Sequence, residues 1–147
     1  NKWVEQVRQR ASEENAKVVV VSSQVESELL ELSPEERDDY LASLGVETGG
    51  LKSLIRATYD LLGLRTFFTT GEKETRAWTI PVGSTAPDAG VAIHSDFKEK
   101  FIRAQVVSFA DLVSAGSIAS ARETGKVRTE GKDYIVQDGD VIEFMHS

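Results

Sequence analysis

The two Gly-Lys pairs are where this sequence comes nearest to phosphoryl-transfer chemistry. A P-loop reads Gly-x-x-x-x-Gly-Lys followed by Ser or Thr, because its amides hold phosphates and its hydroxyl holds Mg²⁺. Here Gly125-Lys126 is followed by a valine and Gly131-Lys132 by an aspartate. Neither pair fits the motif, so we predict no catalytic residue in this chain and no nucleotide hydrolysis by the chain alone.

The polar run Ser22-Ser23-Gln24 comes directly after four consecutive valines. Continuous β-branched apolarity is typical of a strand covered on both faces, so we predict a buried strand over residues 17–22. Ligands of open α/β sheets bind at the carboxyl ends of the strands. The three polar residues are therefore candidates for contact with a nucleotide base or ribose. Ordinary capping of the following helix by Ser23 is the alternative.

Basic side chains in the second half are candidates for contacts with RNA phosphate: Arg76, Lys98, Lys100, Arg103, Lys126, Arg128 and Lys132. They would form one patch if their segments shared a face of a sheet. The interspersed acids Glu99, Glu130 and Asp133 dilute that charge. A solvated surface without a partner is the alternative interpretation.

The formal net charge of −7 is unevenly spread along the chain. Residues 1–64 carry 7 basic against 12 acidic side chains, whereas residues 65–147 carry 10 against 12. The first part should be repelled by nucleic acid, while the second can present a local basic face. The overall charge argues against tight, non-specific binding to bare nucleic acid, and we expect no DNA partner.

Histidine and aromatic residues have structural interpretations that compete with functional ones. His94 has no second histidine or carboxylate pair at metal-ligand spacing, so we predict that it caps a short helix or anchors the next loop with Asp96. Aromatic residues in predicted strands could stack on bases, but core packing is favoured for them. Trp78 is the exception if its face is left uncovered. The others are Phe67, Phe68, Phe101, Phe109, Tyr134 and Phe144.

Composition places the 147 residues in one ordinary domain or two small ones. Apolar residues make up 40% and charged residues 28%, which is the profile of a globular chain with a core. No run of about 18 apolar residues occurs, so we expect no membrane partner. The sequence has no cysteine, which removes disulfides and thiolate zinc sites and fits a reducing compartment.

Residues 1–64 are predicted to be helical around the one strand. The helices are expected over residues 1–16, 23–32, 34–45 and 51–62. Ser33, Pro34 and Glu36 give one of them a cap, a first-turn proline and a capping box. The segment resembles the end of an α/β layer that lacks most of its sheet and would expose apolar surface. Because Asn1 is neither an initiator Met nor the start of a signal peptide, we expect truncation upstream.

The pattern changes at residues 64/65, where we place a domain boundary. Runs over residues 65–70 and 74–80 predict a hairpin around Gly71-Glu72-Lys73. A short helix capped by Ser84 or Thr85 should follow and reach about residue 94. We expect the remaining elements to be a strand at 101–109, short helices at 111–115 and 117–123, and a hairpin of 134–136 with 141–144.

In the predicted third strand, Ile102, Ala104 and Val106 should share one face. In the final hairpin, Asp138-Gly139 should form the tight turn. This order of elements suits an α+β, β-grasp (ubiquitin-like) fold, in which one helix packs across a mixed sheet. The predicted fold class is therefore a β-grasp domain preceded by an α/β fragment.

Seven stretches occur in a distinctive order over roughly 80 residues. They are residues 59–64, 66–69, 76–80, 85–87, 93–97, 101–104 and 130–141. In this order they closely resemble the TGS domain that closes Obg-like ATPases of the YchF family of P-loop NTPases. Residues 1–64 look like the last strand and closing helices of that family's nucleotide-binding domain. Residues 20–26 take the place of its last nucleotide-binding loop.

The resemblance implies a cytoplasmic, translation-associated NTPase that prefers ATP, binds Mg²⁺ and associates with ribosomes. These cofactors, ATP or GTP with Mg²⁺, would belong to the complete protein, and we expect none in this chain. The TGS domain would be a docking or regulatory module for RNA or the ribosome. The alternative is a protein–protein module that regulates its own upstream nucleotide-binding domain without RNA contact. The choice between ATP and GTP stays open, because the base-reading motif would lie upstream.

Overall fold

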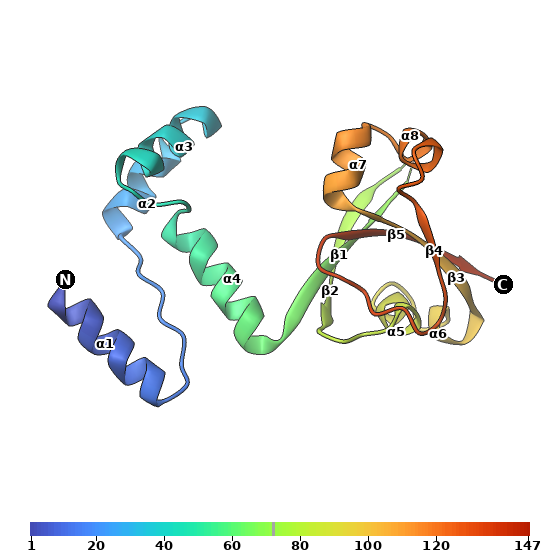
Figure 1. Ribbon diagram of the computed structural model, residues 1–147, viewed down its shortest axis with the longest axis horizontal. Coiled ribbons are helices and arrows are strands. Elements are labelled where there is room, and N and C mark those ends of the chain that lie inside the picture. The colour runs from blue at the N-terminus through green and yellow to red at the C-terminus, as the bar shows by residue number, and fades with distance from the viewer. Residues whose placement is uncertain (72) are drawn as a thin grey trace. The chain divides into compact units, whose positions relative to one another are not determined.

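The computed structural model describes residues 1–71 and 73–147, which form two compact units, and the division along the chain falls between Leu62 and Gly63 (Figure 1). We call Asn1–Leu62 the amino-terminal unit and Gly63–Ser147 the carboxy-terminal unit. The predicted turn around residue 72 lies partly outside the described residues. Among the helices described, none has the length and apolarity needed to cross a bilayer.

The amino-terminal unit is made of four helices. They are α1 (Lys2–Glu13), α2 (Ser23–Leu30), α3 (Pro34–Ser43) and α4 (Gly50–Leu62). The predicted capping box of α3 is confirmed. Its Ser33 hydroxyl accepts from the Glu36 amide at 3.4 Å, and the Ser33 amide donates to the Glu36 carboxylate at 2.8 Å. The Glu36 carboxyl pKa is lowered, chiefly by that backbone hydrogen bond.

The predicted strand over residues 17–22 is wrong for this unit. These residues have no regular secondary structure, and residues 1–62 contain no β-strand with which they could form a ladder. Val20 and Val21 are consequently 57% and 47% exposed. The segment lies instead on the first turn of α4, where a Cβ added to Gly50 would come within 3.0 Å of Val21.

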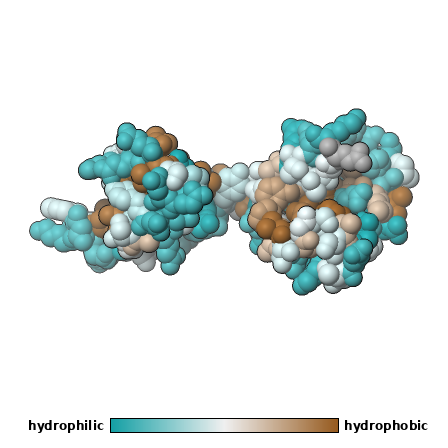
Figure 2. Space-filling view, turned by 90° about the horizontal axis from the view of Figure 1, so that it is seen from above, coloured by the Kyte–Doolittle hydropathy of each residue, from teal (hydrophilic) through white to brown (hydrophobic). Residues whose placement is uncertain are grey.

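Helix α4 carries the apolar stripe that its sequence predicts, but nothing within the unit covers it. None of its residues is buried, and its large aliphatic side chains are 47% to 66% exposed. These are Leu51, Leu54, Ile55, Leu61 and Leu62. Hydrophobic residues accordingly reach the surface in the space-filling view (Figure 2). The expectation that this part exposes apolar surface is confirmed.

The carboxy-terminal unit is built on a mixed five-stranded sheet with the order β2-β1-β5-β3-β4. Its strands are β1 (Leu64–Thr70), β2 (Thr75–Pro81), β3 (Phe101–Ser108), β4 (Arg128–Glu130) and β5 (Asp140–His146). Strands β1 and β5 run parallel, and the other neighbours are antiparallel. The predicted first hairpin and third strand are confirmed, and the fold is mixed α+β.

Helices cover both faces of this sheet (Figure 1). One side holds α5 (Ala86–Val91) and α6 (Phe97–Lys100), and the other holds α7 (Phe109–Ala115) and α8 (Ile118–Glu123). Thr85 caps α5 by accepting from the Asp88 amide, which selects one of the two predicted caps. The core under α5 includes the fully buried Phe67 and Val136, and the core under α8 includes Val107. A helix is thus packed across a mixed sheet, as predicted.

Two details of strand pairing differ from the sequence prediction. Ile102 does not share a face with Ala104, because a register shift between Phe101 and Arg103 turns its side chain outward to 57% exposure. The final hairpin is also wrong. Residues 134–136 bond to the chain before α5, where Val136 donates to the Ser84 carbonyl at 3.1 Å, and β5 pairs with β1 and β3 instead.

Asp140, at the start of β5, explains why residues 134–136 cannot fold back as a strand. Its carboxylate accepts from the Tyr134 hydroxyl at 2.7 Å and from the Gln137 amide at 2.8 Å. The residue is only 3% exposed. Burial and this hydrogen bond together raise the pKa of the Tyr134 phenol. The loop is therefore wound around a buried carboxylate.

Removal of that carboxylate should destabilise the carboxy-terminal unit. We expect Asp140→Ala to lower the free energy of unfolding by about 1–3 kcal/mol, because the Tyr134 hydroxyl and the Gln137 amide both lose a buried acceptor. Tyr134→Phe should lower it by about 1 kcal/mol, because it deletes one hydrogen bond and keeps the ring. Urea unfolding followed by circular dichroism measures both, and exposed Asp133→Ala is the matched control. Equal stability of Asp140→Ala and the control would contradict this account.

Candidate functional site

The run Ser22-Ser23-Gln24 forms the start of α2 and lies on the surface. Ser22, rather than Ser23, is the helix cap, since its hydroxyl accepts from the Val25 amide at 3.4 Å. Gln24 donates to Glu28 at 3.0 Å. The capping alternative for Ser23 is therefore wrong, and its side chain is left exposed at the first turn of the helix. A helix start of this kind presents amide donors suited to an anionic or polar ligand.

Acidic side chains that the sequence analysis missed fix α2 to the other helices. The Glu26 carboxylate accepts from the Gly50 amide, the first of α4, at 2.6 Å. The Glu28 carboxylate accepts from the Tyr40 hydroxyl of α3, and this bond lowers the Glu28 pKa. The candidate loop is thus held by contacts with two helices. Nothing local marks these residues, because their partners lie 12 and 24 positions away.

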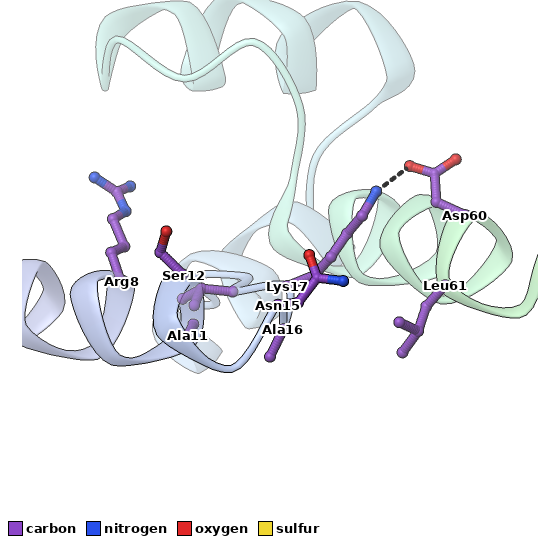
Figure 3. A pocket seen from close by; sticks show the side chains of 9 residues that line it. Arg8, Ala11, Ser12, Asn15, Ala16, Lys17, Asp60 and Leu61 are labelled. Carbon is purple, nitrogen blue, oxygen red and sulfur yellow. Dashed lines mark hydrogen bonds and ion pairs between the residues drawn. The ribbon is translucent and has the colours of Figure 1, made fainter.

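An open hollow of about 590 Å³ lies between the end of α1 and the end of α4 (Figure 3). Lys17 reaches across it to Asp60, with 2.8 Å between Nζ and Oδ2. Arg8, at the rim, pairs with Glu5 at 3.0 Å. Because both cations have carboxylate partners, the hollow offers little unpaired charge to a ligand. We assign it no role.

Most of the predicted RNA-contacting cations are already paired within the unit. The pairs are Lys98–Asp88 at 2.8 Å, Lys100–Asp96 at 2.7 Å, Lys126–Asp111 at 3.1 Å and Arg128–Glu130 at 3.4 Å. Arg128 also lies 3.7 Å from the buried Asp140. Each internal carboxylate cancels part of the charge that a phosphate would meet. The surface potential at these four positions is correspondingly reduced.

The remaining three candidates have no carboxylate partner among residues 1–71 and 73–147. Arg76 lies over the Trp78 ring, 4.3 Å from its centroid. Arg103 directs its Nε toward the Met145 sulfur at 3.1 Å. Lys132 lies in an exposed turn. The sheet order puts β2 and β4 at opposite edges, about 19 Å apart, so Arg76 and Arg128 do not share one patch.

Two further cations emerge only in the folded unit. Arg122 of α8 donates to the Gln105 side chain of β3 at 2.5 Å. Arg65 of β1 donates to the Gln137 side chain at 3.2 Å. Both have amide rather than carboxylate partners and so keep their charge. No local pattern singles them out, because their partners are 17 and 72 positions away.

His94 and the aromatic residues follow their structural interpretations with one exception. His94 Nδ1 accepts from the Asp96 amide at 3.2 Å, which confirms its role in anchoring that loop. The part of the chain that the structure describes holds no group of three side chains able to ligate a metal. Phe109 is the exception, since it is 56% exposed, although its ring lies 6.0 Å from that of Phe68 between centroids.

Lysine pairing can be tested through the carboxyl groups. The pKa values of Asp88 and Asp96 are lowered, first of all by hydrogen bonds from Lys98 and Lys100. Lys100→Ala should therefore raise the Asp96 pKa toward its ordinary value of about 3.9. It should leave the Asp88 pKa unchanged, and Lys98→Ala should do the reverse. Carbon-detected NMR titration of the carboxyl groups measures both.

The same variants test pH-dependent stability. A lowered pKa in the folded state stabilises the fold above the ordinary carboxyl pKa, and the effect disappears as pH falls through the folded value. The wild type should therefore exceed Lys100→Ala in stability near neutral pH but not in strong acid. An Asp96 pKa that is the same in the wild type and in Lys100→Ala would contradict the pairing.

The carboxy-terminal unit corresponds to a known family model. Residues 64–147 match YchF-GTPase_C, described as a protein of unknown function (DUF933). The chain is 52% identical over 145 residues to the ribosome-binding ATPase YchF of Escherichia coli O157:H7, covering 99% of this chain and 40% of that protein. It is 52% identical over 144 residues to the ribosome-binding ATPase YchF of Bacillus subtilis (strain 168), covering 98% and 39%.

Solved structures give the same result. The YchF GTPase of Schizosaccharomyces pombe aligns with a TM-score of 0.77 at 29% identity, over 99% of this chain and 39% of that one. A GTP binding protein from Pyrococcus horikoshii OT3 aligns with a TM-score of 0.66 at 17% identity, over 100% and 42%. At 17% identity the likeness concerns the fold alone. The chain spans about 40% of the length of the curated relatives it matches.

Proposed function

The chain belongs to the YchF family, and from that membership we propose that it is the carboxy-terminal part of a ribosome-associated, Obg-like ATPase. The observation that carries the proposal is that both units together are 52% identical in sequence to proteins named ribosome-binding ATPase. In this proposal residues 1–64 close the nucleotide-binding domain, residues 65–147 are the TGS domain, and the complete protein is cytoplasmic.

The carboxy-terminal unit is proposed to be a β-grasp TGS domain. The sheet order β2-β1-β5-β3-β4, with parallel β1 and β5 at its centre and α5 packed across one face, supports this assignment. Its role is to dock the protein on the ribosome or its RNA. Cations without carboxylate partners among the described residues support that role, and they include Arg65, Arg76, Arg103, Arg122 and Lys132.

The loop Ser22–Gln24 is proposed to contact the base or ribose of ATP in the complete protein. Its exposure, and its position directly after the extended valine run, support this role. GTP is the alternative nucleotide, since relatives are named both ATPase and GTPase. ATP and Mg²⁺ would be held mainly by residues outside this chain, because its sequence contains no P-loop.

A second candidate function is a protein–protein module that regulates its own nucleotide-binding domain without RNA contact. The observation that favours it is the internal neutralisation of four predicted RNA contacts by carboxylates. An exposed aromatic and aliphatic pair on α7, Phe109 and Val113, also suits a protein partner. The two candidates differ in their expected salt dependence, because only phosphate contacts release counterions.

Ribosome sedimentation separates these functions. We expect the chain to pellet with ribosomes at low salt and to be released at moderate salt. The double variant Arg103→Glu/Lys132→Glu should weaken pelleting about fivefold or more, because it removes two phosphate contacts. The control Lys52→Glu/Arg56→Glu makes the same charge change in the amino-terminal unit and should pellet like the wild type. Salt-insensitive pelleting, equal for both variants, would favour the protein–protein module.

The chain alone should not turn over ATP, and measurable turnover would contradict the proposal.

The nucleotide loop is testable in the complete protein. Ser23→Glu should lower ATP affinity about tenfold or more, because it puts a carboxylate where the nucleotide would lie. An acidic residue in the first turn of a helix is favourable, so the fold should be retained. Ser27→Glu, one turn further along α2 and exposed, is the matched control. Isothermal titration calorimetry measures both, and equal affinities would exclude the loop from the nucleotide site.

A further inference from the structure

The open hairpin of β1 and β2 carries an arginine stacked on a tryptophan. Arg76 and Trp78 are two residues apart on β2 and so project from the same face of the sheet. The guanidinium carbon lies 4.3 Å from the centroid of the indole ring. The ring is itself held in place, since its Nε1 donates to the Thr69 hydroxyl at 2.9 Å and it packs against the core under α5. The tryptophan ring that supports the arginine is therefore fixed in position by the rest of the unit.

The charge of this arginine is not used inside the molecule. In the described part of the chain, the Arg76 side chain has neither a carboxylate partner nor a hydrogen bond, in contrast to Lys98 and Lys100. Stacking occupies one face of a guanidinium and leaves its other face and its in-plane N–H groups available. Because the indole already restricts the side chain, little conformational entropy is lost when a ligand binds.

The surroundings of the stack are polar. In β2 only Trp78 and Ile80 are shielded from solvent, and the rest of the strand is exposed. On the same face, the Thr69 hydroxyl lies beside the indole and accepts from its Nε1 at 2.9 Å. Protein–protein interfaces have an apolar core, which this edge lacks. One aromatic platform with a cation above it and a hydroxyl beside it is instead the arrangement that binds unpaired nucleotides.

We propose that the Arg76–Trp78 stack is a binding site for single-stranded RNA. An unpaired base stacks on the outer face of the guanidinium, and the in-plane N–H groups donate to the adjoining phosphate. Duplex RNA is disfavoured, because its bases are not available for stacking. This inference rests on the proposed docking role and gives it a ligand, an unpaired loop or end of RNA. The net charge of −7 keeps the affinity modest and strongly dependent on salt.

Tryptophan fluorescence tests the site directly. The chain has two tryptophans, so Trp3→Phe leaves Trp78 as the single fluorophore. Titration of this variant with 12-nucleotide oligouridylate or oligoadenylate should quench the emission saturably. The logarithm of the association constant should fall with the logarithm of salt concentration with a slope of about −0.7 for one phosphate.

Substitutions of the arginine complete the test. In the Trp3→Phe background, Arg76→Ala should weaken binding about tenfold, and Arg76→Lys should recover the salt dependence but not the full affinity. Lys98→Ala, which removes a cation paired with Asp88, is the control and should bind like its parent. Arg76 is exposed, so its variants should keep the thermal midpoint of the parent.

The outcomes separate this inference from the docking role. Absent quenching, quenching by duplex RNA as strong as by single strands, or an affinity unchanged by Arg76→Ala would each overturn the site. Quenching by oligoglutamate in place of RNA would assign the stack to an acidic protein partner and also overturn it. If Arg76→Ala pellets with ribosomes as well as the wild type does, the Arg76–Trp78 site is not the RNA-binding site, but the proposed docking role is retained. If the wild type does not pellet, the docking role itself fails.

Discussion

A single buried carboxylate, that of Asp140, organises the carboxy-terminal unit. A carboxyl group at 3% exposure is tolerated only when hydrogen bonds replace the water that it has lost. The Tyr134 hydroxyl and the Gln137 amide supply those bonds. The Arg128 guanidinium adds an ion pair, with 3.7 Å between its nitrogen and the Asp140 carboxylate oxygen. These groups come from the loop before β5 and from β4. The carboxylate therefore fixes where β5 begins, and β5 lies between β1 and β3 in the sheet.

The same requirement decides which surface cations are left for a partner. Arg128 is drawn toward Glu130, Asp140 and the Tyr134 ring, so its charge serves the loop that surrounds the buried carboxylate. Lysines 98, 100 and 126 have partners of their own. Functional charge in this unit is thus what remains after internal pairing. It is found on β1, β2, β3 and α8 and in the turn at Lys132.

Local sequence signals predicted local structure well. The capping box at Ser33, the cap at Thr85 and the first hairpin each depend on residues within a few positions of one another, and all three are confirmed. The errors arise where distant residues decide. Residues 134–136 have strand-like composition, yet Asp140 and the chain near Ser84 determine their partners. The bulge at Ile102 depends on how β3 aligns with β5, which no period along β3 can reveal.

The valine run before Ser22 is the case in which sequence and structure disagree most informatively. Its composition is that of a strand, and within the described residues it has no partner strand. Backbone donors and acceptors of such a run form a ladder wherever a neighbouring strand is present, because burial of its valines is favourable. The exposed stripe of α4 has the same requirement for a covering surface. A sheet that supplied both would place Ser22–Gln24 at its carboxyl edge, with Glu26 holding α4 beside it at 2.6 Å. The nucleotide role proposed for Ser22–Gln24 therefore depends on a partner strand from outside residues 1–71 and 73–147.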